Sequence, residues 1–97
     1  MTRYLLRPRA QRDIEEIWDY SAATWGGDQA EIYIRQIEKT LELIADDPRL
    51  GRSCDIIRAG YRKFRTGSQF VFYRSLEGSI EVVRVLHQSM DFEQHLY

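Results

Sequence analysis

The chain is short of the features that mark secreted, membrane-bound and disordered proteins. It has one cysteine, Cys54, among 97 residues, so no internal disulfide can form and nothing favours an oxidising compartment. Two prolines and 43% hydrophobic residues are typical of a globular chain. No apolar run approaches the roughly 20 residues that span a bilayer, and the first residues lack the apolar segment of a signal peptide. These absences predict a single cytoplasmic domain over residues 1–97 that does not associate with membranes.

Motifs of the common catalytic and metal sites are also missing. The sequence has no phosphate-binding glycine loop, no dinucleotide-binding glycine pattern, no nucleophile elbow and no zinc-protease helix. His87 and His95 have no third ligand at a suitable spacing. Cys54 has no neighbouring base that would make it a nucleophile, so it is interpreted as a loop or edge residue. We therefore predict no metal, no cofactor and no dedicated catalytic residues.

The net charge of −1 conceals a division between the two halves of the chain. Residues 8–47 hold four Lys/Arg against ten Asp/Glu, which gives −6, whereas residues 48–87 hold eight against three, which gives +5. This division predicts an acidic helical layer and a basic sheet layer, although the two layers could simply be solvated by different charges. The near-zero total argues against general nucleic-acid binding, which usually needs a basic excess.

The basic half reads as a three-stranded antiparallel meander. Runs of β-branched and aromatic residues at Gly60–Thr66, Gln69–Ser75 and Ser79–His87 are joined at Gly67-Ser68 and Glu77-Gly78. Each joint has the glycine that a tight hairpin turn requires. Cations alternate with the aromatic side chains of this stretch: Arg58, Arg62, Lys63, Arg65, Arg74 and Arg84 beside Tyr61, Phe64, Phe70, Phe72 and Tyr73. Such a surface suits an anionic partner.

The acidic half reads as a helical hairpin after a short strand. The run Tyr4–Leu6 ends before Pro8, and apolar residues then recur at helical spacing over Arg9–Trp25 and Gln29–Ala45. Asp28 is the expected N-cap of the second helix. The sequence thus predicts a two-layer α+β domain, with an N-terminal strand and an antiparallel helical hairpin packed on a mainly antiparallel sheet that contains the C-terminal meander.

The last strand predicts a surface that the helices cannot cover. Strict alternation places the even-numbered residues of 80–86 on one face and the odd-numbered residues of 81–87 on the other, and both sets contain apolar side chains. A helical hairpin covers one face only. One alternative is that the second face is covered by the connector 49–58 and by the tail 88–97, in which residues 91–93 suit a helical turn. The other alternative is that a partner covers it. We favour a partner, because exposed apolar area ringed by arginine is typical of protein-binding sites.

A metal-independent ribonuclease is the enzymatic alternative. It would use arginines to stabilise a phosphorane-like transition state and a histidine or tyrosine to move protons. Arg62, Lys63, Arg65, Arg84 and His87 are suitable residue types. Alternation places Arg62 opposite Lys63 and Arg65, and Arg84 opposite His87, unless a bulge intervenes. The alternative therefore stays open but is disfavoured.

The order of elements and several short motifs resemble the RelE/ParE superfamily of bacterial toxins, and in detail the ParE branch. The likeness covers nearly the whole chain, and the pattern at its end is the most specific. The motifs that carry it are Pro8-Arg-Ala10, Asp13-Ile-Glu-Glu-Ile-Trp18-Asp-Tyr20, Trp25-Gly26, Asp47-Pro48-Arg-Leu-Gly51-Arg52, Arg58-Ala-Gly60-Tyr-Arg62, Gly67-Ser68, Val71-Phe-Tyr73-Arg74 and Arg84-Val-Leu-His87-Gln-Ser-Met90-Asp91.

This resemblance implies a toxin of a type II toxin–antitoxin system that a ParD-like antitoxin neutralises. The antitoxin would be a ribbon-helix-helix dimer with a C-terminal segment that wraps the toxin, and operator DNA would be bound only through it. Free toxin would inhibit DNA gyrase without enzymatic activity of its own, whereas a RelE-type toxin would cut ribosome-bound mRNA. We predict antitoxin contacts at Trp18, Tyr20, Tyr33, Arg62, Arg65, Arg74 and Arg84. Target contacts are predicted at Arg84, His87, Met90 and Asp91.

Overall fold

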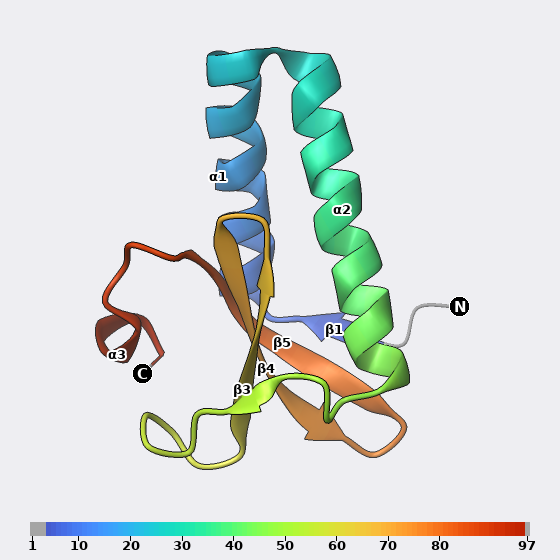
Figure 1. Ribbon diagram of the computed structural model, residues 1–97, viewed down its shortest axis with the longest axis vertical. Coiled ribbons are helices and arrows are strands. Elements are labelled where there is room, and N and C mark those ends of the chain that lie inside the picture. Colours follow the sequence, from blue (N-terminus) through green and yellow to red (C-terminus); the bar gives the residue numbers. More distant parts are fainter. Residues whose placement is uncertain (1–3, 97) are drawn as a thin grey trace.

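A helical hairpin packs on one face of a twisted five-stranded sheet (Figure 1). The computed structural model describes residues 4–96. In the sequence, two long helices follow the first strand and precede the other four, and a one-turn helix comes after the last strand. The elements in order are β1 (Tyr4–Leu6), α1 (Pro8–Trp25), α2 (Gly27–Asp46), β2 (Arg52–Ser53), β3 (Tyr61–Thr66), β4 (Gln69–Leu76), β5 (Ser79–His87) and α3 (Phe92–His95). This arrangement confirms the predicted α+β fold class.

The strands follow the order β1-β5-β4-β3-β2. The short strand β1 pairs in parallel with β5, and all other neighbouring strands are antiparallel. Both hairpin turns of the meander are confirmed, since Gly67 and Gly78 have φ of 59° and 75°. Arg52 and Ser53 of the connector pair with the outer edge of β3 and form β2, a strand that was not predicted from the sequence. A two-residue strand has no periodicity that a sequence pattern could reveal.

The two helices reverse direction through a single residue. Gly26 has a φ of 95°, donates its backbone N–H to Ala22 and precedes the first residue of α2. The expectation that Asp28 caps this helix is wrong, because α2 begins at Gly27 and Asp28 lies within its first turn. A positive φ of this size is readily adopted by glycine, which makes the tight reversal possible.

A β-bulge in β5 overturns the predicted assignment of faces. Phe72 pairs with Arg84 and Tyr73 pairs with Val82, so Val83 is an extra residue between the two pairs. Strict alternation is therefore wrong across this point, because an inserted residue reverses the parity of everything that follows. Val82 and Val85 both join the helix-side core, although strict alternation put them on opposite faces.

The helix-side core joins both helices to the middle of the sheet. Ile37, Leu41 and Ile44 of α2 are fully buried against strands β4 and β5. Within this core the Tyr73 hydroxyl donates to the Pro48 carbonyl at 2.7 Å and accepts the Gly51 amide at 2.8 Å. These bonds tie the start of the connector to the sheet. The remaining members of the cluster are Ala10, Ala45, Val71, Ile80, Val82 and Val85.

The second face of the sheet is covered by the chain itself. The connector supplies Cys54 and Ile57, and the tail supplies Phe92 and Leu96. They enclose a second buried cluster that includes Tyr61, Phe72, Val83 and Leu86. The prediction that a partner covers this face is therefore wrong, and the alternative of connector and tail holds. Cys54 is buried here, and burial raises the pKa of its thiol.

Candidate functional site

An open groove lies where the helical hairpin passes the ends of the central strands. Both helices extend beyond the edge of the sheet, so their upper turns have no strand beneath them (Figure 1). The groove has a volume of about 830 Å³, and its lining comes from α1, α2, the β3–β4 turn, β5 and the tail. Its apolar lining includes Ile17, Tyr20, Trp25, Val85 and Met90.

Large apolar side chains at this groove are exposed to water. Tyr20 and Trp25 are 67% and 60% exposed, and their rings meet edge to face with centroids 6.0 Å apart. Met90 of the tail, which also lines the groove, is 44% exposed. Exposed aromatic and methionine side chains around a concavity are typical of protein-binding surfaces, because a partner that covers them removes apolar area from water.

Tyr33 fixes one wall of the groove. Its hydroxyl donates to the side-chain carbonyl of Gln69 and accepts the Ser68 amide at 3.0 Å. These bonds tie α2 to the turn between β3 and β4. A side chain at Gly67 would collide with the Tyr33 ring, so glycine at this turn serves close packing as well as a positive φ. The groove wall is therefore preformed in the absence of a partner.

A buried ion pair lies behind the groove. The carboxylate of Asp13 accepts Nε and Nη2 of Arg84 at 2.7 and 2.9 Å and the Val85 amide at 3.0 Å. The Asp13 carboxylate raises the pKa of Arg84 above its ordinary value. Asp13 was not among the contact residues predicted from the sequence. Its spacing was the missed signal, because it lies three residues after Ala10 and four before Ile17, on the buried stripe.

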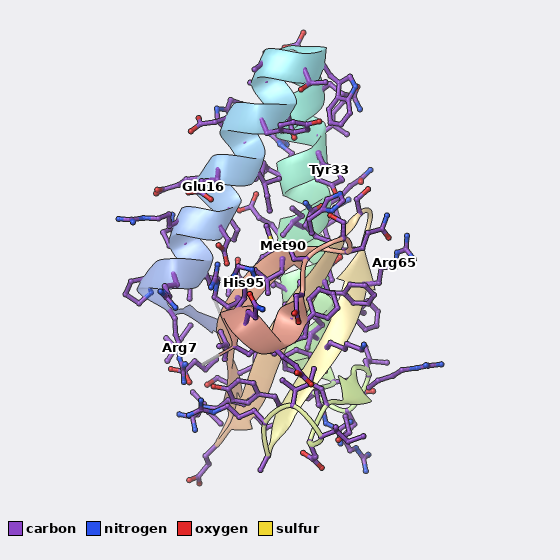
Figure 2. The ribbon with its side chains drawn as sticks, turned by 90° about the vertical axis from the view of Figure 1, so that its left-hand side faces the viewer. Arg7, Glu16, Tyr33, Arg65, Met90 and His95 are labelled. Atoms are coloured by element: carbon purple, nitrogen blue, oxygen red, sulfur yellow. The ribbon has the colours of Figure 1, made fainter. Side chains whose placement is uncertain are left out.

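The predicted arginines do not converge on one site. Arg62 donates to the Gly51 carbonyl at 2.7 Å, Arg65 to the Gly67 carbonyl at 3.0 Å, and Arg74 to Glu81 at 2.6 Å. Figure 2 shows Arg65 and Arg7 on opposite sides of the tail. Of the predicted contact residues, the groove brings together Tyr20, Tyr33, His87 and Met90. Trp18, Asp91 and the four arginines do not line it.

The side-chain hydrogen bonds of His87 within residues 4–96 are made to Ser89. Its Nδ1 lies 2.7 Å from the Ser89 hydroxyl and accepts the Ser89 amide at 3.1 Å. The Arg84 side chain leaves β5 on the opposite face from that of His87 and is bound to Asp13. Across residues 4–96 no group of three His, Cys, Asp or Glu side chains is arranged to bind a metal ion. Over the same residues, no helix is long and apolar enough to cross a bilayer.

A separate ion cluster joins Arg7, which lies between β1 and α1, to β4 and β5 at the far end of the sheet. Glu81 accepts Arg7 at 3.0 Å and Arg74 at 2.6 Å, and these bonds lower the pKa of the Glu81 carboxyl below its ordinary 4.5. The folded state therefore binds this proton more weakly than the unfolded chain. The contribution of these bonds to the free energy of unfolding is fully present above pH 4.5 and is lost as the pH falls through the lowered pKa of Glu81.

Glu81→Gln should consequently lower the free energy of unfolding near neutral pH and cost nothing in strong acid. Chemical denaturation of both proteins between pH 3 and pH 7 measures the difference. The two stability curves should converge as the pH falls below the ordinary glutamate pKa of 4.5. A gap that stays constant across the range would show that the charge of Glu81 contributes nothing.

These features define a small α+β domain that presents an exposed apolar groove. Comparison with known families then identifies the chain. Residues 4–92 match the family described as ParE toxin of type II toxin-antitoxin system, parDE, and the chain belongs to this family. The recognition made from sequence motifs is thereby confirmed.

The sequences of named relatives are similar to this chain over nearly its whole length. Toxin ParE1 of Mycobacterium tuberculosis is 53% identical over 96 residues, which cover 98% of each chain. Toxin ParE1 of Caulobacter vibrioides is 45% identical, with 99% of each chain covered. Among solved structures, a chain of the chromosomal ParDE TA system from P. aeruginosa has the same fold, with a TM-score of 0.76 over 90% of this chain and 96% of that one, at 16% identity.

Proposed function

We propose that the chain is neutralised by a ParD-like antitoxin whose toxin-wrapping segment occupies the groove. The observation that carries this proposal is the exposure of Tyr20, Trp25 and Met90 around one preformed apolar concavity. An amphipathic helix lying across the hairpin would bury these side chains on its apolar face. Folding of a disordered antitoxin segment on this surface provides the apolar burial that offsets its loss of conformational freedom.

An extended continuation of that segment would run along the sheet. Tyr33 and His87 mark this direction, since they line the groove from α2 and from the end of β5. Acidic side chains of the antitoxin would meet Arg65, which is exposed at the β3–β4 turn. Operator DNA would be bound by the antitoxin dimer alone, because the near-neutral toxin has no basic excess of its own.

The free toxin acts, in this proposal, as a non-enzymatic inhibitor of DNA gyrase that leads to DNA damage and growth arrest. Support comes from the positions of the cations. A ribonuclease of the RelE type needs arginines and a proton-transfer group around one scissile phosphate. Here Arg84 is bound to a carboxylate and faces away from His87, and Arg62 is bound to a backbone carbonyl on the opposite face from Arg65.

An assay of mRNA on ribosomes separates this proposal from the ribonuclease alternative. The free chain should leave ribosome-bound mRNA intact at concentrations that arrest growth, because Arg62, Arg84 and His87 are not gathered around one site within residues 4–96. Primer extension on the mRNA detects cuts at the ribosomal A site. Cleavage by the wild-type chain that is lost in a folded His87→Ala variant would establish the ribonuclease and refute the inhibitor.

A further inference from the structure

The C-terminal tail connects the groove to the second face of the sheet. β5 ends at His87, whose side chain lines the groove, and Met90 lines it as well. Phe92 and Leu96, only a few residues later, pack into the second cluster on the opposite face. Residues 88–96, here named the strap, therefore pass around the end of β5 from one face of the sheet to the other (Figure 2).

The strap is held mainly by tertiary contacts. Its helix α3 has four residues, too few to be stable by itself. The Phe92 ring lies 4.8 Å from that of Phe72 and 5.4 Å from that of Phe70, and Lys63 lies over the rings of Phe70 and Phe92. These contacts form a cover that opening of a short segment could remove without unfolding the domain.

One polar contact ties the far end of the strap to the rest of the domain. Nη1 of Arg84 donates to the carbonyl of His95 at 3.1 Å. The other side of the same guanidinium is fixed by Asp13, and the Arg84 side chain is only 14% exposed. A single arginine thus joins α1, β5 and the strap. Because Asp13 also lines the groove, the contact begins at the groove and ends on the strap.

We propose that Asp13 and Arg84 form a clamp that holds the strap closed, and that the clamp couples the strap to whatever fills the groove. A segment bound in the groove lies against both Asp13 and Met90, so it orders the two ends of this connection at once. A strap that the clamp already holds closed loses less conformational freedom when the groove is filled, so the closed strap raises the affinity of the groove. By the same coupling, a segment bound in the groove favours the closed strap. The coupling rests on the proposed antitoxin groove, whereas the clamp itself does not.

Arginine is needed at this position because its planar fork presents donors in fixed directions. Nε and Nη2 face the Asp13 carboxylate while Nη1 points to the His95 carbonyl. A lysine keeps the positive charge beside Asp13 but concentrates its donors at one atom. Arg84→Lys should therefore preserve the ion pair with α1 and release the strap.

Hydrogen exchange of the free chain tests the clamp. In Arg84→Lys, amides of the strap should exchange about tenfold faster or more than in wild type, while amides of α2 and β4 keep their wild-type rates. Arg74→Lys is the matched control, because Arg74 forms an ion pair with Glu81 remote from the strap. The readout uses Met90, Glu93 and Gln94, whose amides donate hydrogen bonds within the strap or at its start. Wild-type exchange rates of the strap in folded Arg84→Lys would overturn the clamp.

The wild-type protein supplies a second measurement if Arg84→Lys fails to fold. Strap amides should exchange by a local opening that depends less on denaturant than global unfolding does. Exchange of these amides only through global unfolding would overturn the clamp.

The complex tests the coupling. Bound, purified ParD-type antitoxin should slow exchange of the strap in wild type by about tenfold or more, and by less in Arg84→Lys. Equal slowing in the two proteins, or none in either, would overturn the coupling. Absence of antitoxin binding would overturn both the coupling and the proposed function of the groove. The clamp would then be tested only by hydrogen exchange of the free chain.

Discussion

Tyr20→Asp should weaken antitoxin binding by about a hundredfold and leave the toxin folded. Tyr20 is two-thirds exposed, so its replacement removes little from the core. The variant deletes an aromatic contact at the groove and places a charge where the partner must bury apolar surface. Losses of this size, about 2.7 kcal/mol, are typical of central aromatic residues in interfaces. Isothermal titration with the purified antitoxin measures the dissociation constant.

Ile32→Asp is the matched control for this experiment. Ile32 is 50% exposed on α2 and does not line the groove, so the same aspartate introduces a charge at comparable exposure. Its affinity for the antitoxin should stay within about threefold of wild type, because substitutions outside the contact surface are nearly neutral. Equal losses in the two variants would show that the groove has no special role in binding.

Asp13→Ala should lower the free energy of unfolding by about 3–5 kcal/mol, which is a large part of the stability of a small domain. The alanine leaves the guanidinium of Arg84 buried without its carboxylate. It also removes the acceptor of the Val85 amide at the unpaired edge of β5. Urea denaturation followed by circular dichroism measures the change in the unfolding free energy.

Glu31→Ala provides the comparison for an exposed ion pair. Nη2 of Arg35 lies 2.7 Å from Oε1 of Glu31 within α2, but both side chains are more than half exposed. Such pairs contribute about 0.3–0.5 kcal/mol, so this variant should be nearly as stable as wild type.

A loss below about 1 kcal/mol for Asp13→Ala would mean that Arg84 escapes to solvent and that the buried pair is not a structural link.

Much of the fold could be predicted from the sequence, because its signals are local. Apolar residues at helical spacing identified both helices, and the glycines at positions 67 and 78 identified the turns of the meander. The run Tyr4–Leu6 before Pro8 was sufficient to predict the first strand. The tail was predicted to form a helical turn at residues 91–93, and α3 begins there with Asp91 accepting the Glu93 amide. Tyr97 lies outside the described residues.

The remaining features depend on contacts between distant segments. The bulge at Val83 arises from the pairing of β4 with β5, and nothing in the local sequence marks an extra residue there. Asp13 could have been placed on the buried stripe by its spacing, but its partner Arg84 lies 71 residues away. The groove is assembled from α1, α2, the β3–β4 turn, β5 and the tail. Tyr20 and Tyr33 were therefore predicted as contact residues of the hairpin, whereas Trp25, which also lines the groove, was not predicted.

Supercoiling of relaxed plasmid by purified DNA gyrase tests the central claim most directly. The free chain should block supercoiling and trap cleaved DNA, whereas the same chain with an excess of antitoxin should do neither. The Ile32→Asp variant should inhibit as wild type does and should also be released by the antitoxin. Full gyrase activity in the presence of excess free, folded toxin would contradict the account.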